Sequence, residues 1–253
     1  MAAISPQLLD TIYELQNLPS FEKSALGGGT NLAIRYAHRI STDIDIFFPD
    51  IIGRAGFQGI EKDVQRFYGT QLFGLQYPCN IDEQFIFLRF FLIKDGETIK
   101  VEVMQNMVML DGYEMYEGIR MVSEQDIALF KLMSAANRAS QKDIYDLDYL
   151  TENFDLILLH QTLSKKQKMF SDLKFQNIFD QDNEVSPVAE PLLLLKFDEG
   201  RSVVNGKRPA HSQNRIEVME GAKNWNSARS SWRSKVRKLF NHLGIDFPSI
   251  KAQ

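Results

Sequence analysis

Two apolar runs joined by a short turn constrain the fold of this chain more than any other feature of its sequence. The first run, QFIFLRFFLI, ends at Ile93, and the second, TIKVEVMQN, begins at Thr98. Between them lie Lys94, Asp95 and Gly96, and Asp and Gly tolerate the backbone angles that a tight hairpin turn needs. We therefore predict two antiparallel strands, the first covered on both faces because its apolar run is continuous.

The second of these strands has two different faces. Successive side chains point to opposite sides of a sheet, and the β-branched residues fall on one side. They are Ile99, Val101 and Val103. The other side carries Lys100, Glu102 and Met104. Glu102 is thus a candidate for holding a metal ion or for acting as a general base, and the alternative is a polar residue paired with Lys100 on a half-exposed strand.

The spacing of apolar residues changes from strand-like to helical at Ser123. The two segments SEQDIALFKLMSAANRAS and QKDIYDLDYLTENF have apolar residues at helical spacing, and Ser123 with acids behind it is a good helix start. The whole chain has 253 residues, of which 44% are hydrophobic and 25% charged, as in an ordinary globular protein. We predict the α+β class: a small mixed sheet with helices over residues 1–122, followed by a mostly helical domain over residues 123–253 that closes a cleft.

The N-terminus predicts a helix and no export signal. Ser5 and Pro6 form a good cap and first turn, and apolar residues recur at helical spacing until Pro19. No run approaches the roughly 18 apolar residues of a membrane span, and the first residues lack the basic start of a secretory signal. A cytoplasmic location without a membrane partner is the resulting expectation. The single cysteine, Cys79, excludes an internal disulfide.

A glycine run followed by two spaced aspartates is the first candidate for chemistry. Gly27 to Gly29 let the backbone approach an anion closely, and the amides at the start of the helix that follows favour phosphate. Thr30 adds a hydroxyl at that helix start. Asp43 and Asp45 lie two apart on a predicted strand, so both carboxylates project from one face, where they can share one or two Mg²⁺ ions. Each motif alone is common, because most glycine runs are turns and most paired aspartates are solvated.

Together these residues resemble a known signature. The segment GGGTNLAIRYAHRISTDIDIFF is similar to that of the AbiEii/AbiGii-like abortive-infection toxin nucleotidyltransferases, a branch of the polymerase-beta-type superfamily. In that family a Gly-Gly-Thr turn precedes a His-Arg-x-Ser-x-Asp-x-Asp strand. The matching positions are Gly28, Gly29, Thr30, His38, Arg39, Ser41, Asp43 and Asp45. The resemblance implies that the two glycines and Thr30 bind the nucleotide together with Arg39 and Ser41. The alternative for Arg39 is a structural role, bonded to loop carbonyls.

A second segment extends the resemblance through the predicted helices. DIALFKLMSAANRASQKDIYDLDYL looks like the helical part of the family, in which a lysine is followed by Lys-Asp-x-x-Asp. This implies that Lys131 contacts the nucleotide phosphates and that Asp143 is a catalytic residue that closes the site, with Lys142 and Asp146 as secondary candidates. From the residues alone, Lys131 is a surface lysine on an amphipathic helix, and Lys142 with Asp146 is a simple helical ion pair.

The resemblance covers residues 20–155 and implies an activity. It implies transfer of a nucleoside monophosphate from an NTP to an acceptor hydroxyl, with Asp43, Asp45 and Glu102 placed to hold Mg²⁺ or Mn²⁺. It also implies a toxin of a toxin–antitoxin or phage-defence system, with a cognate antitoxin as partner. Members of the family differ in their acceptor, and RNA, specifically tRNA, is the acceptor that we expect here. Two alternatives stay open: transfer to a protein or to a small molecule such as an aminoglycoside, and a non-catalytic NTP-binding module. Two adjacent like charges at Asp43 and Asp45 argue against the second alternative.

Positive charge is concentrated near the C-terminus. The net charge of the chain is −4, yet ten Lys or Arg lie between Gly200 and Phe240 against only Glu217 and Glu220. The segment RSSWRSKVRKLFNHLG has apolar residues at helical spacing, namely Trp232, Val236, Leu239, Phe240 and Leu243. The basic residues around them are Arg229, Arg233, Lys235, Arg237 and Lys238. An amphipathic helix docked on the body and a phosphate-backbone track for an RNA acceptor are both consistent with this pattern.

Overall fold

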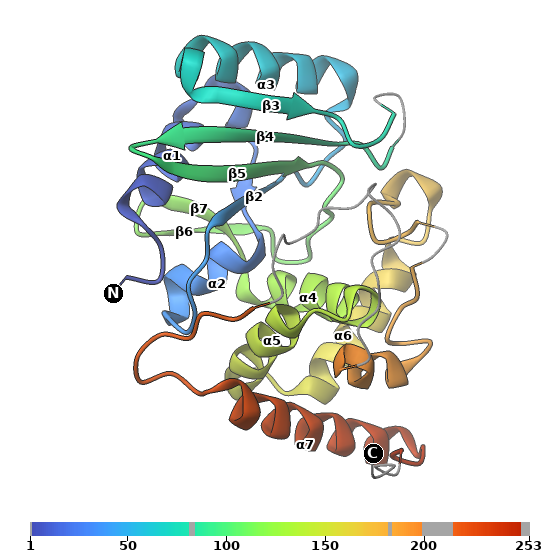
Figure 1. Cartoon of the computed structure of the whole chain (residues 1–253). Helices are drawn as coiled ribbons and strands as arrows, with labels where there is room; N and C mark the ends of the chain where they lie inside the picture. The colour runs from blue at the N-terminus through green and yellow to red at the C-terminus, as the bar shows by residue number, and fades with distance from the viewer. Residues whose placement is uncertain (1, 81–83, 182–183, 199–214, 249–253) are drawn as a thin grey trace.

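A mixed sheet with helices packed on both faces forms the body of the protein (Figure 1). The structure, a computed structural model, describes residues 2–80, 84–181, 184–198 and 215–248. The strands are β1 (Ala25–Leu26), β2 (Asp43–Phe47), β3 (Leu72–Gln76), β4 (Phe87–Lys94), β5 (Glu97–Met104), β6 (Tyr113–Tyr116) and β7 (Ile119–Val122). The helices are α1 (Pro6–Asn17), α2 (Gly28–Tyr36), α3 (Gly53–Tyr68), α4 (Glu124–Arg138), α5 (Gln141–Asn153), α6 (Leu156–Met169) and α7 (Trp225–Leu243). The predicted α+β class is confirmed.

The strand that carries the two aspartates lies in the middle of the sheet. The strand order is β3-β4-β5-β2-β1-β7-β6. β2 runs parallel to β5, and β1 runs parallel to β7, whereas the other neighbours are antiparallel. Because its neighbours hydrogen-bond along both of its edges, β2 is a rigid support for a site.

The predicted hairpin is confirmed as β4 and β5. Asp95 and Gly96 have positive φ angles of 51° and 83°, as a two-residue turn requires, and Lys94 pairs with Glu97. The expectation that the first strand is covered on both faces is wrong at its outer end, where the Ile93 side chain is 48% exposed. On the same face, Phe87 at the opposite end of β4 belongs to the cluster shared with the helical half.

The helix starts follow from their caps. The Ser5 hydroxyl accepts a hydrogen bond from the amide of Leu8 at the start of α1, and Ser123 does the same for Asp126 in α4. α2 begins at Gly28, two residues earlier than the sequence predicts, so the glycines belong to its first turn. The sequence pattern predicts a helix only around Glu61 to Tyr68, which is the last part of α3. No element was predicted for β1, β3, β6, β7 and α6.

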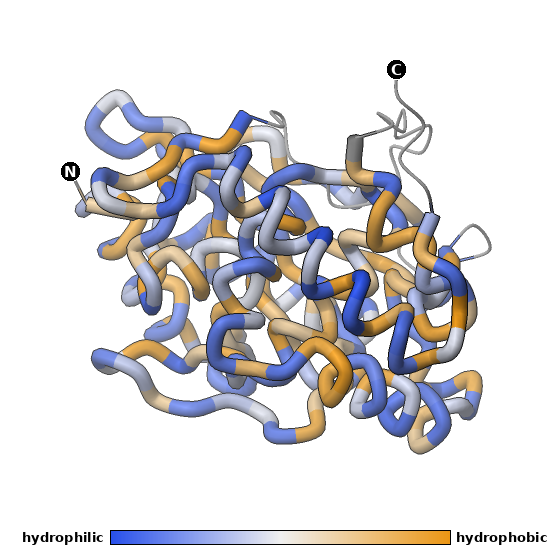
Figure 2. Tube along the Cα trace, turned by 90° about the horizontal axis from the view of Figure 1, so that it is seen from below, coloured by the Kyte–Doolittle hydropathy of each residue, from blue (hydrophilic) through white to orange (hydrophobic). Residues whose placement is uncertain are grey.

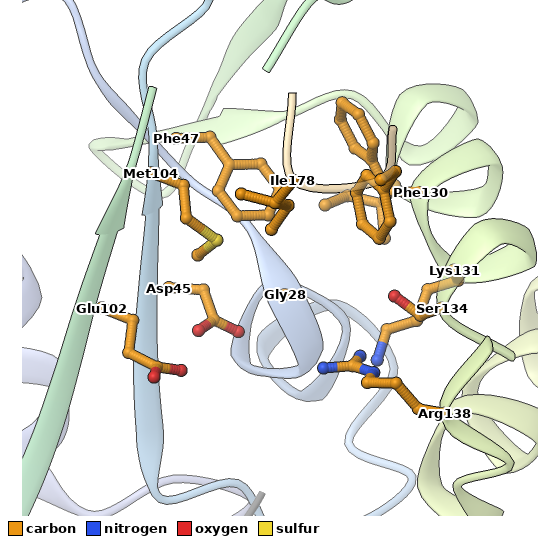
Figure 3. A pocket seen from close by; sticks show the side chains of 12 residues that line it. Gly28, Asp45, Phe47, Glu102, Met104, Phe130, Lys131, Ser134, Arg138 and Ile178 are labelled. Carbon is orange, nitrogen blue, oxygen red and sulfur yellow. The ribbon is translucent and has the colours of Figure 1, made fainter. Parts of the chain in front are cut away.

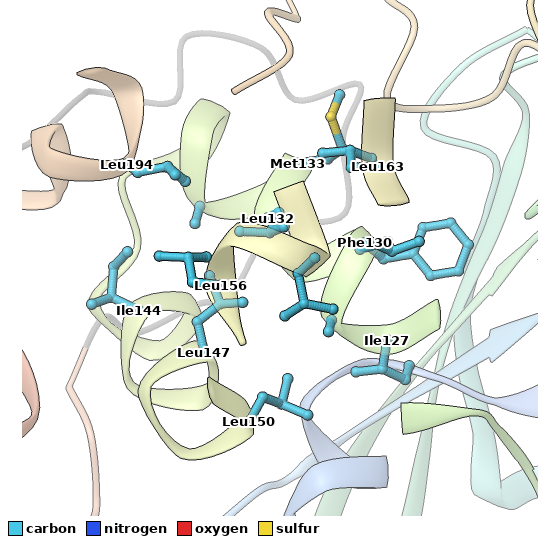
Figure 4. Packing of buried hydrophobic residues seen from close by; sticks show 14 of the residues in the cluster. Ile127, Phe130, Leu132, Met133, Ile144, Leu147, Leu150, Leu156, Leu163 and Leu194 are labelled. Carbon is cyan, nitrogen blue, oxygen red and sulfur yellow. The ribbon is translucent and has the colours of Figure 1, made fainter. Parts of the chain in front are cut away.

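Two hydrophobic clusters hold the layers together, one on each face of the sheet. The first packs α1 and α3 against the sheet. The second joins the other face to the helical half, where Phe47 of β2 and Met104 of β5 share one cluster with Phe130 of α4. Figure 4 shows how this cluster continues between α4, α5 and α6. The predicted boundary near Val122 therefore marks a change from strands to helices across which the packing is continuous.

α7 is the amphipathic helix that the C-terminal pattern predicts. Its apolar residues from Trp232 to Phe240 are buried, and the Trp232 indole donates a hydrogen bond to the carbonyl of Leu194 at 2.9 Å. Leu243, at the end of the helix, is 37% exposed. α7 packs on α5 and α6, on the side away from the sheet (Figure 1). Within the described ranges no helix is long and apolar enough to cross a bilayer.

Hydrophilic and hydrophobic residues alternate along the trace seen from below (Figure 2). This alternation is what amphipathic helices with one buried face require. Three of the ten basic residues of the C-terminal region, Arg201, Lys207 and Arg208, lie outside the described residues. The structure therefore locates the basic surface of α7, which begins at Trp225.

Candidate active site

The glycine turn lies directly against the aspartate strand. The Gly27 amide donates to the Asp45 carbonyl at 2.7 Å, and α2 begins at the next residue. Gly28 has a φ of +60°, and a Cβ at this position would lie 1.9 Å from Oδ2 of Asp45. Only glycine therefore allows α2 to start beside that carboxylate. Gly27 provides no side-chain cap, so the first amides of α2 can bind an anion.

Thr30 and Ser41 fasten the start of α2 to the strand. The buried Thr30 hydroxyl contacts Oγ of Ser41 at 2.9 Å and donates to the Asp43 carbonyl. Both hydroxyls therefore bond within the protein. We infer that these two residues act on a nucleotide through the position of α2 and β2.

The acidic residues on the sheet are arranged by strand register. In the parallel pair of β2 and β5, Asp43 lies beside Lys100 and Asp45 beside Glu102. The Lys100 ammonium lies 3.3 Å from Asp43 and 3.1 Å from Glu102. Arg89 of β4 is opposite Glu102 and binds its Oε1 through two nitrogens, at 2.8 and 2.6 Å. Both oxygens of the Glu102 carboxylate are thus engaged by cations.

The charge at Asp45 is less well compensated than that at Glu102. Burial, together with the neighbouring Glu102 carboxylate, raises the pKa of Asp45 to about 6, although Lys100 acts in the opposite direction. Within residues 2–80, 84–181, 184–198 and 215–248, no group of three His, Cys, Asp or Glu side chains is arranged to hold a metal ion. The predicted ligand set of Asp43, Asp45 and Glu102 is therefore not preformed as a three-carboxylate site.

An ion-pair network forms the wall opposite the sheet. The Lys131 ammonium of α4 lies 2.8 Å from Asp143 and 2.7 Å from Asp146, both on α5. Arg138, about two helical turns after Lys131, binds Asp143 at 3.1 Å. The alternative of a surface lysine is wrong, because Lys131 is only 5% exposed. The three-residue spacing of the aspartates puts both on the helix face that meets α4.

Asp146 is the centre of this network. Arg39 binds it through two nitrogens, at 2.6 and 2.8 Å, and the His38 imidazole contacts it at 2.8 Å. Although burial alone would raise it, the pKa of Asp146 is held well below its usual range by the Arg39 guanidinium and the Lys131 ammonium. Sequence reasoning ranked Asp146 below Asp143, because spacing does not show that a loop arginine will reach it.

Arg39 lies beneath the glycine turn and outside the cavity. It is 2% exposed, and a Cβ added at Gly29 would lie 2.1 Å from its Nη2 atom. This position corresponds to the structural alternative left open for Arg39, although its main partner is Asp146 and its carbonyl partner is Ile40. His38 stacks beside Tyr145, with ring centroids 5.6 Å apart, and burial lowers its pKa.

A cavity separates the acidic sheet face from the basic helical wall (Figure 3). The empty space between the two sides, including the part that is open to solvent, is about 560 Å³. Asp45 and Glu102 line one side, and Lys131 and Arg138 line the other, with Gly28 at the base. Ser134 and six apolar side chains complete the lining, and the apolar residues are Phe47, Met104, Ile127, Phe130, Ile178 and Phe179. Charged groups for phosphates and metal, beside an apolar wall for a flat ring, suit a nucleotide.

Several of these residues were missed by sequence reasoning. Arg89 could have been found, because the turn at Asp95 and Gly96 fixes which β4 residue is opposite Glu102. Arg138 could also have been found from its seven-residue spacing from Lys131. Ile178 and Phe179 come from an irregular segment, and no local pattern places them in the cavity.

Comparisons with known proteins agree with this arrangement. A family model described as "Nucleotidyl transferase AbiEii toxin, Type IV TA system" matches residues 10–239. The uncharacterized protein aq_aa25 of Aquifex aeolicus is 32% identical over 149 residues, which cover 56% of this chain and 66% of that protein. MenT4, a nucleotidyltransferase toxin from Mycobacterium tuberculosis, is similar over 96% of this chain and 84% of its own, with a TM-score of 0.53 and 19% identity.

The two kinds of likeness carry different weight. At 19% identity, the likeness to MenT4 shows a shared fold. The family model spans most of the chain and includes the glycine turn, the aspartate strand and the Lys131 network. The predicted resemblance is thereby confirmed, and the chain belongs to the family of AbiEii nucleotidyl transferase toxins of type IV toxin–antitoxin systems.

Proposed function

We propose that this chain transfers a nucleoside monophosphate from an NTP to a hydroxyl of an RNA acceptor, specifically tRNA. The observation that carries the proposal is the cavity in which Asp45 of the central strand faces Lys131 of α4 beside the start of α2. Membership of a toxin family supports a role as the toxin of a toxin–antitoxin or phage-defence system, with a cognate antitoxin as partner.

The basic wall is suited to a triphosphate. Lys131 is held by Asp143 and Asp146, so its ammonium is presented in a fixed position. Arg138 adds a planar guanidinium that can bind two phosphate oxygens at once. The first amides of α2 point to the same space, where Gly28 lines the cavity. In this arrangement Asp143 acts as a positioning residue for the two cations.

The acidic face fits a divalent cation at Asp43 and Asp45. The two carboxylates share one strand face, and burial, followed by the neighbouring Glu102 carboxylate, raises the pKa of Asp45. Carboxylate oxygens suit Mg²⁺ or Mn²⁺, whose remaining positions are filled by water and phosphate oxygens. When bound, such an ion supplies neutralisation of charge on the α-phosphate and the leaving pyrophosphate. The side chains of the protein contribute the position of the ion and of the triphosphate.

An RNA acceptor would have to be long to touch α7 and the cavity together. α7 packs on α5, whereas the cavity is lined by α4 and the sheet. Two layers of packed helices correspond to a separation of roughly 20 Å. On α7, Arg237 and Lys238 are exposed, while Lys235 is bound to Asp148 at 2.8 Å. The proposal therefore assigns the acceptor end to the cavity and the body of the RNA to α7.

A labelling experiment tests the proposal. The protein is incubated with Mg²⁺, total cell RNA or lysate and each NTP labelled at the α-phosphate, and the labelled fraction is identified. We expect label in RNA of tRNA size, and we expect Asp45→Asn to abolish it, because the variant removes one of the two carboxylates that line the cavity. Asp10→Asn, the same change on the exposed face of α1, is the control.

The other outcomes are equally informative. Label in protein or in small molecules would replace RNA by one of the alternative acceptors. Labelling by Asp45→Asn at the wild-type rate would refute the site, and NTP binding without any transfer would favour a non-catalytic module. Circular dichroism of the variant shows whether a loss of labelling reflects a loss of fold.

A further inference from the structure

We infer that Asp43 and Asp45 hold one divalent cation, and that the ammonium of Lys100 takes the place of a second. The inference rests on the proposed function, because it describes how the site for nucleotidyl transfer meets its need for positive charge. Two-metal sites for such transfers place two ions about 3.5 to 4 Å apart between shared carboxylates. Here one of those places contains a side chain.

The sheet puts Lys100 among the acids by register alone. Asp43 pairs with Lys100 and Asp45 pairs with Glu102 across β2 and β5, so all four side chains project from one face. The ammonium lies 3.3 Å from Oδ2 of Asp43 and 3.1 Å from Oε2 of Glu102, and the lysine side chain is 12% exposed. A buried cation between two carboxylates is the arrangement that a bridging metal ion would otherwise provide.

Both carboxylate oxygens of Glu102 are bound by cations in this arrangement. Its Oε1 accepts from both Nε and Nη2 of Arg89, its Oε2 accepts from Lys100, and the residue is 2% exposed. Binding a metal ion through Glu102 would displace a guanidinium or an ammonium that is itself largely buried. Removing one partner of a buried ion pair is strongly unfavourable. Glu102 is therefore a positioning residue for Lys100.

The balance of charge also indicates a single divalent ion. Three carboxylates, Asp43, Asp45 and Glu102, face two cations, Lys100 and Arg89. Among these five side chains one negative charge is left, and it is located at Asp45, which lines the cavity opposite Arg138. A single divalent ion bound by Asp43 and Asp45 would neutralise that charge. A second ion would lie within about 4 Å of the Lys100 ammonium, where like charges repel strongly.

Electron paramagnetic resonance of bound Mn²⁺ tests the inference without an acceptor. The full chain is loaded with Mn²⁺ and the α,β-methylene analogues of ATP, CTP, GTP and UTP in turn. We expect the spectrum of an isolated ion, with one Mn²⁺ per nucleotide complex. Two Mn²⁺ ions with the spin coupling of close neighbours would overturn the inference for the wild-type chain directly.

Variants of Lys100 extend the test. We expect Lys100→Met to bind two coupled Mn²⁺ ions, because Asp43 and Glu102 then lack their shared cation. Lys100→Arg keeps the charge and should keep one ion. Lys94→Met is the matched control, since Lys94 is on the same hairpin, is 14% exposed and pairs with Glu14, away from the site. It should bind one ion like the wild type.

The outcomes separate this inference from the proposed function. A folded Lys100→Met variant that still binds one ion contradicts the inference, even if the wild type labels RNA. If Lys100→Met does not fold, the wild-type and Lys100→Arg spectra still decide between one ion and two. If the wild type binds no analogue with Mn²⁺ at all, the proposed function fails together with the inference.

Discussion

Among single residues, Asp45 shows most clearly how a buried carboxylate affects stability. Its pKa of about 6 in the folded chain is above the ordinary value of 3.8. The folded state therefore binds the Asp45 proton more tightly than the unfolded state does. The free energy of unfolding consequently falls as the pH rises from about 4 to about 6, and it stays lower above that window.

We predict that Asp45→Asn raises the stability of the metal-free protein at neutral pH. The amide has no proton to lose, so the variant should unfold at a higher temperature than the wild type at about pH 7.5. The difference should shrink as the pH falls below about 6 and disappear at about pH 3, where the wild-type carboxyl is protonated in both states. Thermal unfolding in EDTA at a series of pH values measures it. Asp10→Asn, on the surface, should show no such trend, and an Asp45→Asn variant less stable at neutral pH would contradict the argument.

At the scale of single residues, predictions from the sequence were correct where a motif indicates the chemistry of the side chains. Alternation placed Asp43 and Asp45 on one face of their strand and Glu102 on the polar face of another strand, and the pairing of β2 with β5 brings the three together. The burial of Lys131 was not predictable from its own helix. It depends on Asp143 and Asp146, two acids of the next helix, which turn a position typical of the surface into a buried ion pair.

At the scale of elements, α5 connects the sheet to the helical half through ion pairs. Asp146 on α5 binds Arg39 from the loop before β2 and Lys131 from α4. The same helix presents Tyr145 against His38. The geometry of the cavity wall therefore depends on contacts of α5 with two elements that are far apart in the sequence.

We predict that Asp146→Ala lowers the free energy of unfolding by about 3 to 5 kcal/mol, because it leaves a buried guanidinium and a buried ammonium without their shared carboxylate. Asp155→Ala is the comparison: Asp155 caps α6 by accepting from the amides of Ile157 and Leu158, and its loss should cost about 1 kcal/mol. Urea denaturation measures both. Equal effects of the two substitutions would show that the Asp146 network contributes no more than a helix cap.

Local sequence signals predicted the elements that have strong caps or turns. Ser5, Ser123 and the Asp95-Gly96 turn marked α1, α4 and the β4–β5 hairpin. The hairpin of β6 and β7 was missed because its turn, at Glu117 and Gly118, does not have the Asn-Gly or Asp-Gly form that favours positive φ. β1 has two residues, too few to show any period.

The whole molecule contains information that no local pattern gives. Alternation predicted a strand with two acids, but the position of β2 between β5 and β1 follows from long-range pairing. Because β2 is central, Lys100 and Arg89 lie in contact with the acidic residues. The cavity beside β2 lies between the sheet and α4. The cleft that the helical half was expected to close is formed by this packing, with α7 on the outer side of α5.

At this scale we predict that α7 contributes to RNA binding through charge alone. Replacing both Arg237 and Lys238 by alanine should weaken binding of tRNA and reduce the slope of log K against log salt by about 2, since each phosphate contact contributes nearly one unit. Filter binding between low and moderate salt measures this slope. Binding of a short single-stranded RNA, which reaches only the cavity, should be unchanged.

The matched control removes the same charge elsewhere. Lys62 and Arg66 are exposed on α3, on the face of the sheet opposite the helical half. Their double alanine variant should leave both the affinity for tRNA and its salt slope as in the wild type. If the α3 and α7 variants change the slope equally, the attraction is a property of the total charge of the protein. If only the α7 variant changes it, the RNA body lies along α7, and the distance from α7 to the cavity sets the minimum length of a good acceptor.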